Sequence, residues 1–131
     1  MKRIPNIAIT QALVKLLREH LDVPVTDHLD ESSPLPYVSI GAFTCEDDRT
    51  KVDDLLKCSI DLHIWSEYAG KAQVNSIAEK IISVLNNYDI DISADGFNIF
   101  DGKIAQYEAY EEETYGYNGI ITLDMSVQNL E

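Results

Sequence analysis

Residues 58–66 form the stretch that most restricts the fold of this 131-residue chain. Apolar and polar side chains alternate here one by one, and the apolar positions are Cys58, Ile60, Leu62 and Ile64. Successive side chains of a β-strand point to opposite faces of its sheet. The pattern therefore predicts a strand with one face on a core and the other towards water or a partner.

Two stretches have the helical spacing that would cover the apolar face of such a sheet. Residues 6–21 and 70–87 each place apolar side chains on one stripe. The stripes consist of Ile9, Leu13, Leu16, Leu17 and Leu21 in the first and Val74, Ile77, Ala78, Ile81 and Leu85 in the second. Asn6, which follows Pro5, is expected to cap the first helix.

The remaining strands are expected before and after the second helix. Residues 36–41 begin a strand that pairs with 58–66, and a long charged loop, 46–57, joins the two. Further strands are predicted at 97–100, 104–113 and 119–128. The order α-β-β-α-β-β predicts an α+β fold, with an antiparallel sheet of about four to five strands and two helices packed on it.

The two cysteines are too few for a disulfide scaffold. Strict alternation from Val38 and Ile40 places Cys45 on the outward face, whereas Cys58 shares the inward parity. A β-bulge would bring both to one face, but the simple register predicts no disulfide between them.

The charge of the chain excludes several classes of partner. The sequence has 10 basic and 23 acidic residues, a formal net charge of −13. Such a surface repels DNA, RNA and anionic lipid. No apolar run approaches the roughly 20 residues that cross a bilayer, and no signal-peptide pattern follows the basic N-terminus. We expect a single domain, residues 1–131, that stays in the cytoplasm and binds neither membranes nor specific nucleic-acid sequences.

No pattern in the sequence predicts catalysis. Phosphate loops, nucleophile elbows and paired-cysteine motifs are absent, and His20, His28 and His63 lack metal-ligand spacing. Residues 91–96 match the opening of an EF-hand loop, but Gly102 stands where the twelfth-position glutamate is required. We therefore expect no enzyme activity, cofactor or metal, and interpret 91–96 as an Asp-rich turn.

Interaction surfaces are the remaining candidates for function. Trp65 is predicted to project away from the core, so it either packs over the sheet or forms a protein interface. The acidic residues 108–113 favour a solvated edge, with a lining or a patch for a basic partner as the alternative. The candidate interface residues are Asp47, Asp48, Arg49, Lys51, Asp61, His63, Trp65, Tyr110 and Glu111.

The order of several short motifs resembles a known family. Val-Pro-Val-Thr-Asp at 23–27 precedes Pro-Tyr-Val-Ser-Ile-Gly at 36–41, and Ile-Trp-Ser at 64–66 precedes the second helix with Ile-Ala-Glu-Lys-Ile at 77–81. Tyr-Asn-Gly-Ile-Ile-Thr-Leu-Asp-Met at 117–125 closes the pattern. Over nearly the whole chain, this order is similar to the tail-completion, or tail-terminator, proteins of long-tailed bacteriophages and prophages.

The resemblance implies a structural role. Such proteins form a ring, commonly hexameric, on the head-proximal end of the tail tube, where the ring stops tube growth and docks onto the head. The implied partners are further copies of the chain, the tail-tube protein and the head connector or head-completion protein. Assembly is implied in the host cytoplasm, with a final place in the virion tail. The acidity suits a channel through which DNA passes without binding.

Two alternatives remain open at this point. One alternative to the tail-terminator role is another component of the same head–tail junction or tube. The other, from a different class, is an acidic inhibitor that mimics DNA and binds a basic partner.

Overall fold

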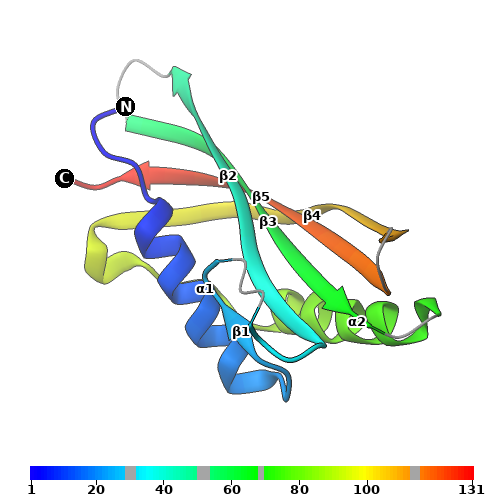
Figure 1. The fold of residues 1–131 in the computed structure, drawn as a ribbon. Helices are drawn as coiled ribbons and strands as arrows, with labels where there is room; N and C mark the ends of the chain where they lie inside the picture. Colours follow the sequence, from blue (N-terminus) through cyan, green and yellow to red (C-terminus); the bar gives the residue numbers. More distant parts are fainter. Residues whose placement is uncertain (29–31, 50–53, 68–69, 113–115) are drawn as a thin grey trace.

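The computed structural model describes residues 1–28, 32–49, 54–67, 70–112 and 116–131 (Figure 1). Its elements are α1 (Asn6–His20), β1 (Val25–Thr26), β2 (Tyr37–Arg49), β3 (Asp54–Ser66), α2 (Lys71–Asn87), the 3-10 helix η1 (Ser93–Asp95), β4 (Phe97–Glu111) and β5 (Tyr117–Asn129). The strands form one sheet in the order β1-β2-β3-β5-β4. The predicted α+β fold with two helices on one sheet is confirmed. The sheet is mixed, because β1 runs parallel to β2 while the other pairs are antiparallel.

Both helices lie against one face of the sheet (Figure 1). α1 packs on β1 and β2, and α2 packs on β3, β4 and β5. The inward parity of β3 is buried as predicted, and Ile60, Leu62 and Ile64 have no exposed surface. The helices bury Ile9, Leu13, Val14, Leu17, Val74, Ile77, Ala78, Ile81 and Val84. Neither helix covers the opposite face, which we call the open face.

The helices differ from the prediction at the cap of α1 and at the borders of the buried stripes. α1 begins at Asn6 itself, so the predicted cap is wrong, and the cap position is Pro5 with no side-chain hydrogen bond. Val84 is buried, whereas Leu85 is only partly buried against the core. A period of 3.6 residues lets two adjacent positions share the border of a buried stripe, which explains the exchange.

The first hairpin is longer than predicted. β2 continues to Arg49 and β3 starts at Asp54, so most of the charged segment 46–57 is strand rather than loop. Residues 50–53 lie outside the described residues. β4 is likewise a single strand that joins the two segments predicted at 97–100 and 104–113.

Irregularities in the pairing of neighbouring strands explain the differences between the predicted and the observed strands. β2 advances from Ile40 to Phe43 while β3 moves only from Leu62 to Ile60. The extra residue reverses the parity of β2 beyond the bulge. The predicted outward direction of Cys45 is therefore wrong, since Cys45 pairs with the inward Cys58.

The segment between α2 and β4 has the geometry of the predicted Asp-rich turn. Asp91 Oδ1 accepts a hydrogen bond from the Ser93 N–H at 2.9 Å. Gly96 ends η1 with a φ of 81°, and β4 follows at once. Of the helices in the described part of the chain, none is long and apolar enough to span a membrane.

Residues before α1 contact the end of the sheet where β3 and β4 begin and β5 ends. The Arg3 guanidinium donates to Asn129 Oδ1 from Nε at 3.0 Å and from Nη2 at 2.7 Å. It also lies over the Phe97 ring, 4.1 Å from the centroid. Asn129 donates in turn to Asp54 Oδ2 at 3.0 Å, and the Lys2 N–H donates to the same oxygen at 3.2 Å. These contacts join the start of the chain to β3, β4 and β5.

Stability at low pH is expected to depend on Asp54. The hydrogen bond from Asn129, followed by that from Lys2, lowers the pKa of this carboxyl below its ordinary value of 3.8 despite desolvation. A pKa lowered in the folded state contributes stability that is complete above 3.8 and is lost as pH falls through the folded-state value.

Asp54→Asn should therefore flatten the loss of stability measured by urea denaturation between about pH 5 and pH 2. The exposed Glu79→Gln in α2 is the control, and it should keep the wild-type profile. Identical acid profiles for Asp54→Asn and wild type would contradict the assignment.

Candidate assembly surface

One row of side chains crosses the open face on four strands. Tyr37 of β2 is the register partner of Trp65 of β3, Trp65 is the partner of Asn118 of β5, and Asn118 is the partner of Tyr110 of β4. We call these four residues the aromatic row. The Tyr37 and Trp65 rings are stacked with centroids 6.3 Å apart. Asn118 Nδ2 donates to the Tyr110 hydroxyl at 2.8 Å. Side-chain contacts thus join β2 to β3 and β5 to β4, and strand pairing joins Trp65 to Asn118.

Polar side chains in and beside the aromatic row are nearly buried and hydrogen-bonded. The Trp65 indole Nε1 donates to Ser39 Oγ at 2.9 Å. The His63 ring stacks on Trp65 at 5.5 Å, and its Nδ1 lies 3.4 Å from Asn118 Oδ1. Ser39 is 2% exposed and Asn118 is 1% exposed, although neither helix covers this face. The row is thus a packed, hydrogen-bonded surface that holds its side chains in fixed positions.

Trp65→Phe is expected to cost about 1 kcal/mol of unfolding free energy, because it removes the indole donor to a nearly buried hydroxyl. Ser39→Ala should cost a similar amount, and the double variant should cost less than the sum of the two. Chemical denaturation of the four proteins measures this coupling. Strictly additive costs would show that the bond between Nε1 and Oγ contributes nothing.

A shallow hollow of about 500 Å³ lies further along the open face. It is lined by Thr44, Glu46, Lys57, Cys58, Ser59, Asp101, Lys103, Asp124, Met125 and Ser126. Its charged side chains are of both signs, with two lysines among three carboxylates. A surface of this kind suits a wet contact with another protein better than it suits a phosphate group, which needs a cluster of cations.

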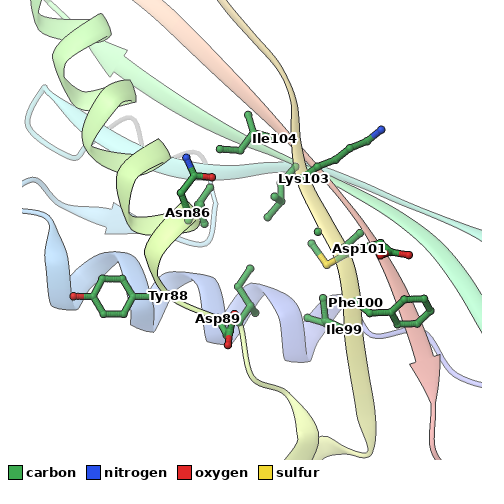
Figure 2. Close-up of a pocket in the computed structure, with 13 residues that line it drawn as sticks. Asn86, Tyr88, Asp89, Ile99, Phe100, Asp101, Lys103 and Ile104 are labelled. Carbon is green, nitrogen blue, oxygen red and sulfur yellow. The ribbon is translucent and has the colours of Figure 1, made fainter.

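A second hollow of about 260 Å³ lies between the end of α2 and β4 (Figure 2). Its apolar walls are Leu85, Ile90, Ile99, Ile104, Leu123 and Met125. Figure 2 shows Lys103 pointing away from the helix and the Tyr88 ring lying towards α1, where its centroid is 4.2 Å from that of His20. Among the described residues that line the hollow, none is Ser, Thr, Cys or His. It therefore lacks the hydroxyl– or thiol–imidazole pair of a nucleophilic active site.

Comparison with known proteins identifies the family. Residues 7–126 match the tail completion protein gp17 family. The chain belongs to this family. The family resemblance predicted from the order of the sequence motifs is confirmed.

Solved structures share the fold of this tail-completion chain. A chain of the virion of the native gene transfer agent particle has a TM-score of 0.79 at 19% identity, covering 94% of this chain and 96% of that chain. The bacteriophage SPP1 gp17 protein has a TM-score of 0.64 at 19% identity, covering 99% and 96%. The sheath/tube terminator of the PVC extracellular contractile injection system has a TM-score of 0.52 at 15% identity, covering 96% of this chain and 58% of that chain. No curated protein matches the sequence significantly.

Four of the predicted interface residues of this tail-completion protein lie near one another on the open face. Trp65 and His63 are stacked there, Tyr110 ends the aromatic row, and Asp61 Oδ1 accepts the Thr122 hydroxyl at 2.9 Å. The predicted outward direction of Trp65 is confirmed by its pairing with Tyr37. Trp65 packs on its neighbours, and its role in an interface between proteins stays a prediction.

Of the other predicted interface residues, Glu111 directly follows Tyr110 along β4, whereas Asp47 and Asp48 lie apart from this group. Asp47 and Asp48 are near the far end of β2, and Glu111 is the exposed last residue of β4. Arg49 ends β2 but its side chain is not among those described, and Lys51 lies outside the described residues.

Sequence reasoning missed three residues of the surface, namely Tyr37, Ser39 and Asn118. The one available signal was that Tyr37 and Ser39 have the parity opposite to the core residue Val38. Their contacts with Trp65 follow from strand register, which the alternation alone does not determine.

Both edges of the sheet have long unpaired segments. Among the described residues, β1 pairs only with Val38 and Ser39, so β2 has no partner on its outer side from Ile40 to Arg49. β4 forms the other edge over its 15 residues, and no described strand lies outside it. The backbone N–H and C=O groups of an edge strand are able to bind a further strand. One subunit thus presents two different edges.

Proposed function

We propose that this protein caps the head-proximal end of a phage tail tube as a ring, stops tube growth there and joins the tail to the head connector. Membership of the tail-completion family over residues 7–126 supports a structural role in the tail. The observation that carries the ring is the pair of unlike open edges on one sheet. A heterologous ring requires two different surfaces on each subunit, each complementary to the other.

In this proposal the edge of β2 beyond Ser39 meets β4 of the neighbouring subunit. The open-face group of Asp61, His63, Trp65 and Tyr110 then contacts either the neighbour or the tail-tube protein. Assembly takes place in the host cytoplasm, and the ring remains in the virion tail. The role requires no cofactor and no catalysis, and DNA passes through the ring without sequence-specific binding.

Charge affects how readily such a ring forms. Each chain carries a formal net charge of −13. Exposed acidic residues lie on both edges, with Glu46 and Asp47 on β2 and Glu108 and Glu111 on β4. Like charges repel, and salt screens that repulsion beyond a Debye length of about 8–10 Å at physiological ionic strength. Self-association of the isolated protein should therefore strengthen as salt is added.

The acidic-inhibitor alternative has less structural support. A mimic of DNA needs a contiguous acidic surface, but the two acidic segments of the chain occupy opposite ends of the sheet. Asp48 lies in the register row of Leu55, whereas Glu111 lies in that of Tyr117 and Ser66.

Electron microscopy of purified tail tubes mixed with the protein tests the capping role. Additional density is expected at one end of each tube, and tubes polymerised in its presence should be shorter. Binding along the sides of the tube, or no binding at all, would count against the proposal. A phage that lacks the protein should accumulate overlong tails without heads.

Proline substitutions test the two edges. Ala42 and Ala105 both lie at register irregularities, where they have no partner strand residue. Ala42→Pro and Ala105→Pro should leave the circular-dichroism spectrum unchanged but abolish capping, since proline removes the N–H that an added strand needs. Ala72→Pro is the matched control, because it lies in the first turn of α2, where proline is tolerated. Normal capping by both edge variants would exclude edge pairing.

A further inference from the structure

Cys45 and Cys58 face each other within the first hairpin. They are direct register partners on β2 and β3, and the Cys58 Sγ lies 3.5 Å from the Cys45 Sγ. Both thiols are free. The bulge between Ile40 and Phe43 brings them to the same face, so their meeting depends on one extra residue in β2.

We propose that this pair is an oxidative modification site, which a small-molecule disulfide such as oxidised glutathione converts into a cross-strand disulfide. The Cys45 thiolate attacks one sulfur of glutathione disulfide, which forms a mixed disulfide and releases one glutathione. Cys58 then attacks the Cys45 Sγ, loses its proton to the solvent and releases the second glutathione. The two cysteines lose two electrons, and these reduce the oxidant to two thiols.

The two thiols have different roles in this sequence. Cys45 is partly exposed, whereas Cys58 is 3% exposed. Burial, together with the hydrogen bond to Cys45 and its charge, raises the pKa of Cys58 to about 12. The thiolate is the attacking species. Cys45 is therefore the thiol that reacts with the oxidant, and Cys58 is the one that resolves the mixed disulfide.

The disulfide would fix the register of β2 against β3 beyond the bulge. Asp47 and Asp48 lie just past Cys45, so the bond would hold these candidate interface residues against Leu56 and Leu55. The reducing cytoplasm keeps the thiols free, and an oxidising medium favours the disulfide. The expectation that the protein meets such a medium, on release of the virion, rests on the proposed function. The thiol chemistry itself does not depend on that function.

Treatment of the reduced, purified protein with oxidised glutathione tests the site. After an acid quench, the wild-type protein should have lost two hydrogen atoms by intact-mass spectrometry, should have no thiol left to alkylate and should remain free of intermolecular bonds. Cys58→Ser should stop at a glutathione adduct on Cys45. Cys45→Ser should react many times more slowly, because its remaining thiol is buried.

Three results would overturn the proposal: alkylatable thiols that persist in the wild-type protein, a stable glutathione adduct on it, or equal reaction rates of the two serine variants. Thermal denaturation is the second measurement. Oxidation should raise the midpoint of the wild-type protein and should leave both serine variants unchanged. The oxidation assay uses the isolated protein, so a negative result would not contradict the proposed capping of tail tubes. A failure to cap tubes would likewise not contradict the thiol chemistry.

Discussion

Replacing Gly116 with alanine is expected to lower the free energy of unfolding by about 3 kcal/mol or more. Gly116 has a φ of 62°, a region that costs an L-residue about 1–2 kcal/mol. A Cβ at this position would also overlap the carbonyl oxygen of Ser66, at the end of β3. A clash with a backbone atom cannot be relieved by rotating a side chain, so either the end of β3 or the start of β5 must move.

Urea denaturation measures the effect, and Gly102→Ala provides the matched control. A Cβ built on Gly102 has nothing within 4 Å. The control should be neutral or should stabilise the protein by about 0.4–1 kcal/mol through the unfolded state. Equal stabilities of the two variants would contradict the described approach of Gly116 to β3. Because small domains are stable by only about 5–15 kcal/mol, the Gly116 variant should also be poorly expressed at 37 °C.

Leu62→Ala is expected to lower the free energy of unfolding by about 2–5 kcal/mol. Leu62 lies on the central strand β3 between its register partners Ile40 and Ile121, and it has no exposed surface. Alanine would leave a cavity at the layer where the sheet meets the helices, and the surrounding core would close it only in part.

The control for this prediction is Ser59→Ala, three positions earlier on the same strand. Its side chain lies on the open face, and removal of the hydroxyl should change stability by no more than about 0.5 kcal/mol. Denaturation curves of both variants therefore test which face of β3 is the core. Similar costs for the two substitutions would show that the assignment of faces is wrong.

The alternation in 58–66 was sufficient to predict the faces of β3 because this strand is regular along its whole length. Elsewhere the same reasoning failed at irregularities that leave no mark in the pattern. One extra residue between Ile40 and Phe43 turned Cys45 inward, and the register shift after Phe100 concealed that β4 is a single strand. The face of each strand residue is assigned by counting from the residues before it. One extra residue that the sequence pattern does not reveal therefore reverses every later assignment.

The charged end of the first hairpin shows a second limit of sequence reasoning. Glu46, Asp47 and Lys57 are exposed on strands, although the sequence predicted a loop there. Alternation arises from burial on one face. It continues in β3 to the buried Leu56, but the consecutive charged residues 46–49 of β2 hide it in the sequence. Of the candidate surface, Trp65 and His63 could be found from parity alone. The positions of Ser39 and Asn118 beside them required the register of three strands.

The strand order divides the sheet into two hairpins, β2–β3 and β4–β5, joined along the pairing of β3 with β5. Each hairpin is local in sequence, whereas the join brings together residues as distant as Asp54 and Asn129, 75 positions apart. Closing so long a loop costs entropy before its contacts form, and contacts of high sequence separation slow folding.

We therefore expect the two hairpins to form early and their joining, under α2, to limit the folding rate. Until then each hairpin exposes an apolar face, and β3 and β5 each have an unpaired edge. Partly folded species of this kind aggregate readily. The newly made chain is thus most vulnerable in the interval before β3 meets β5, and host chaperones would act on it at that stage.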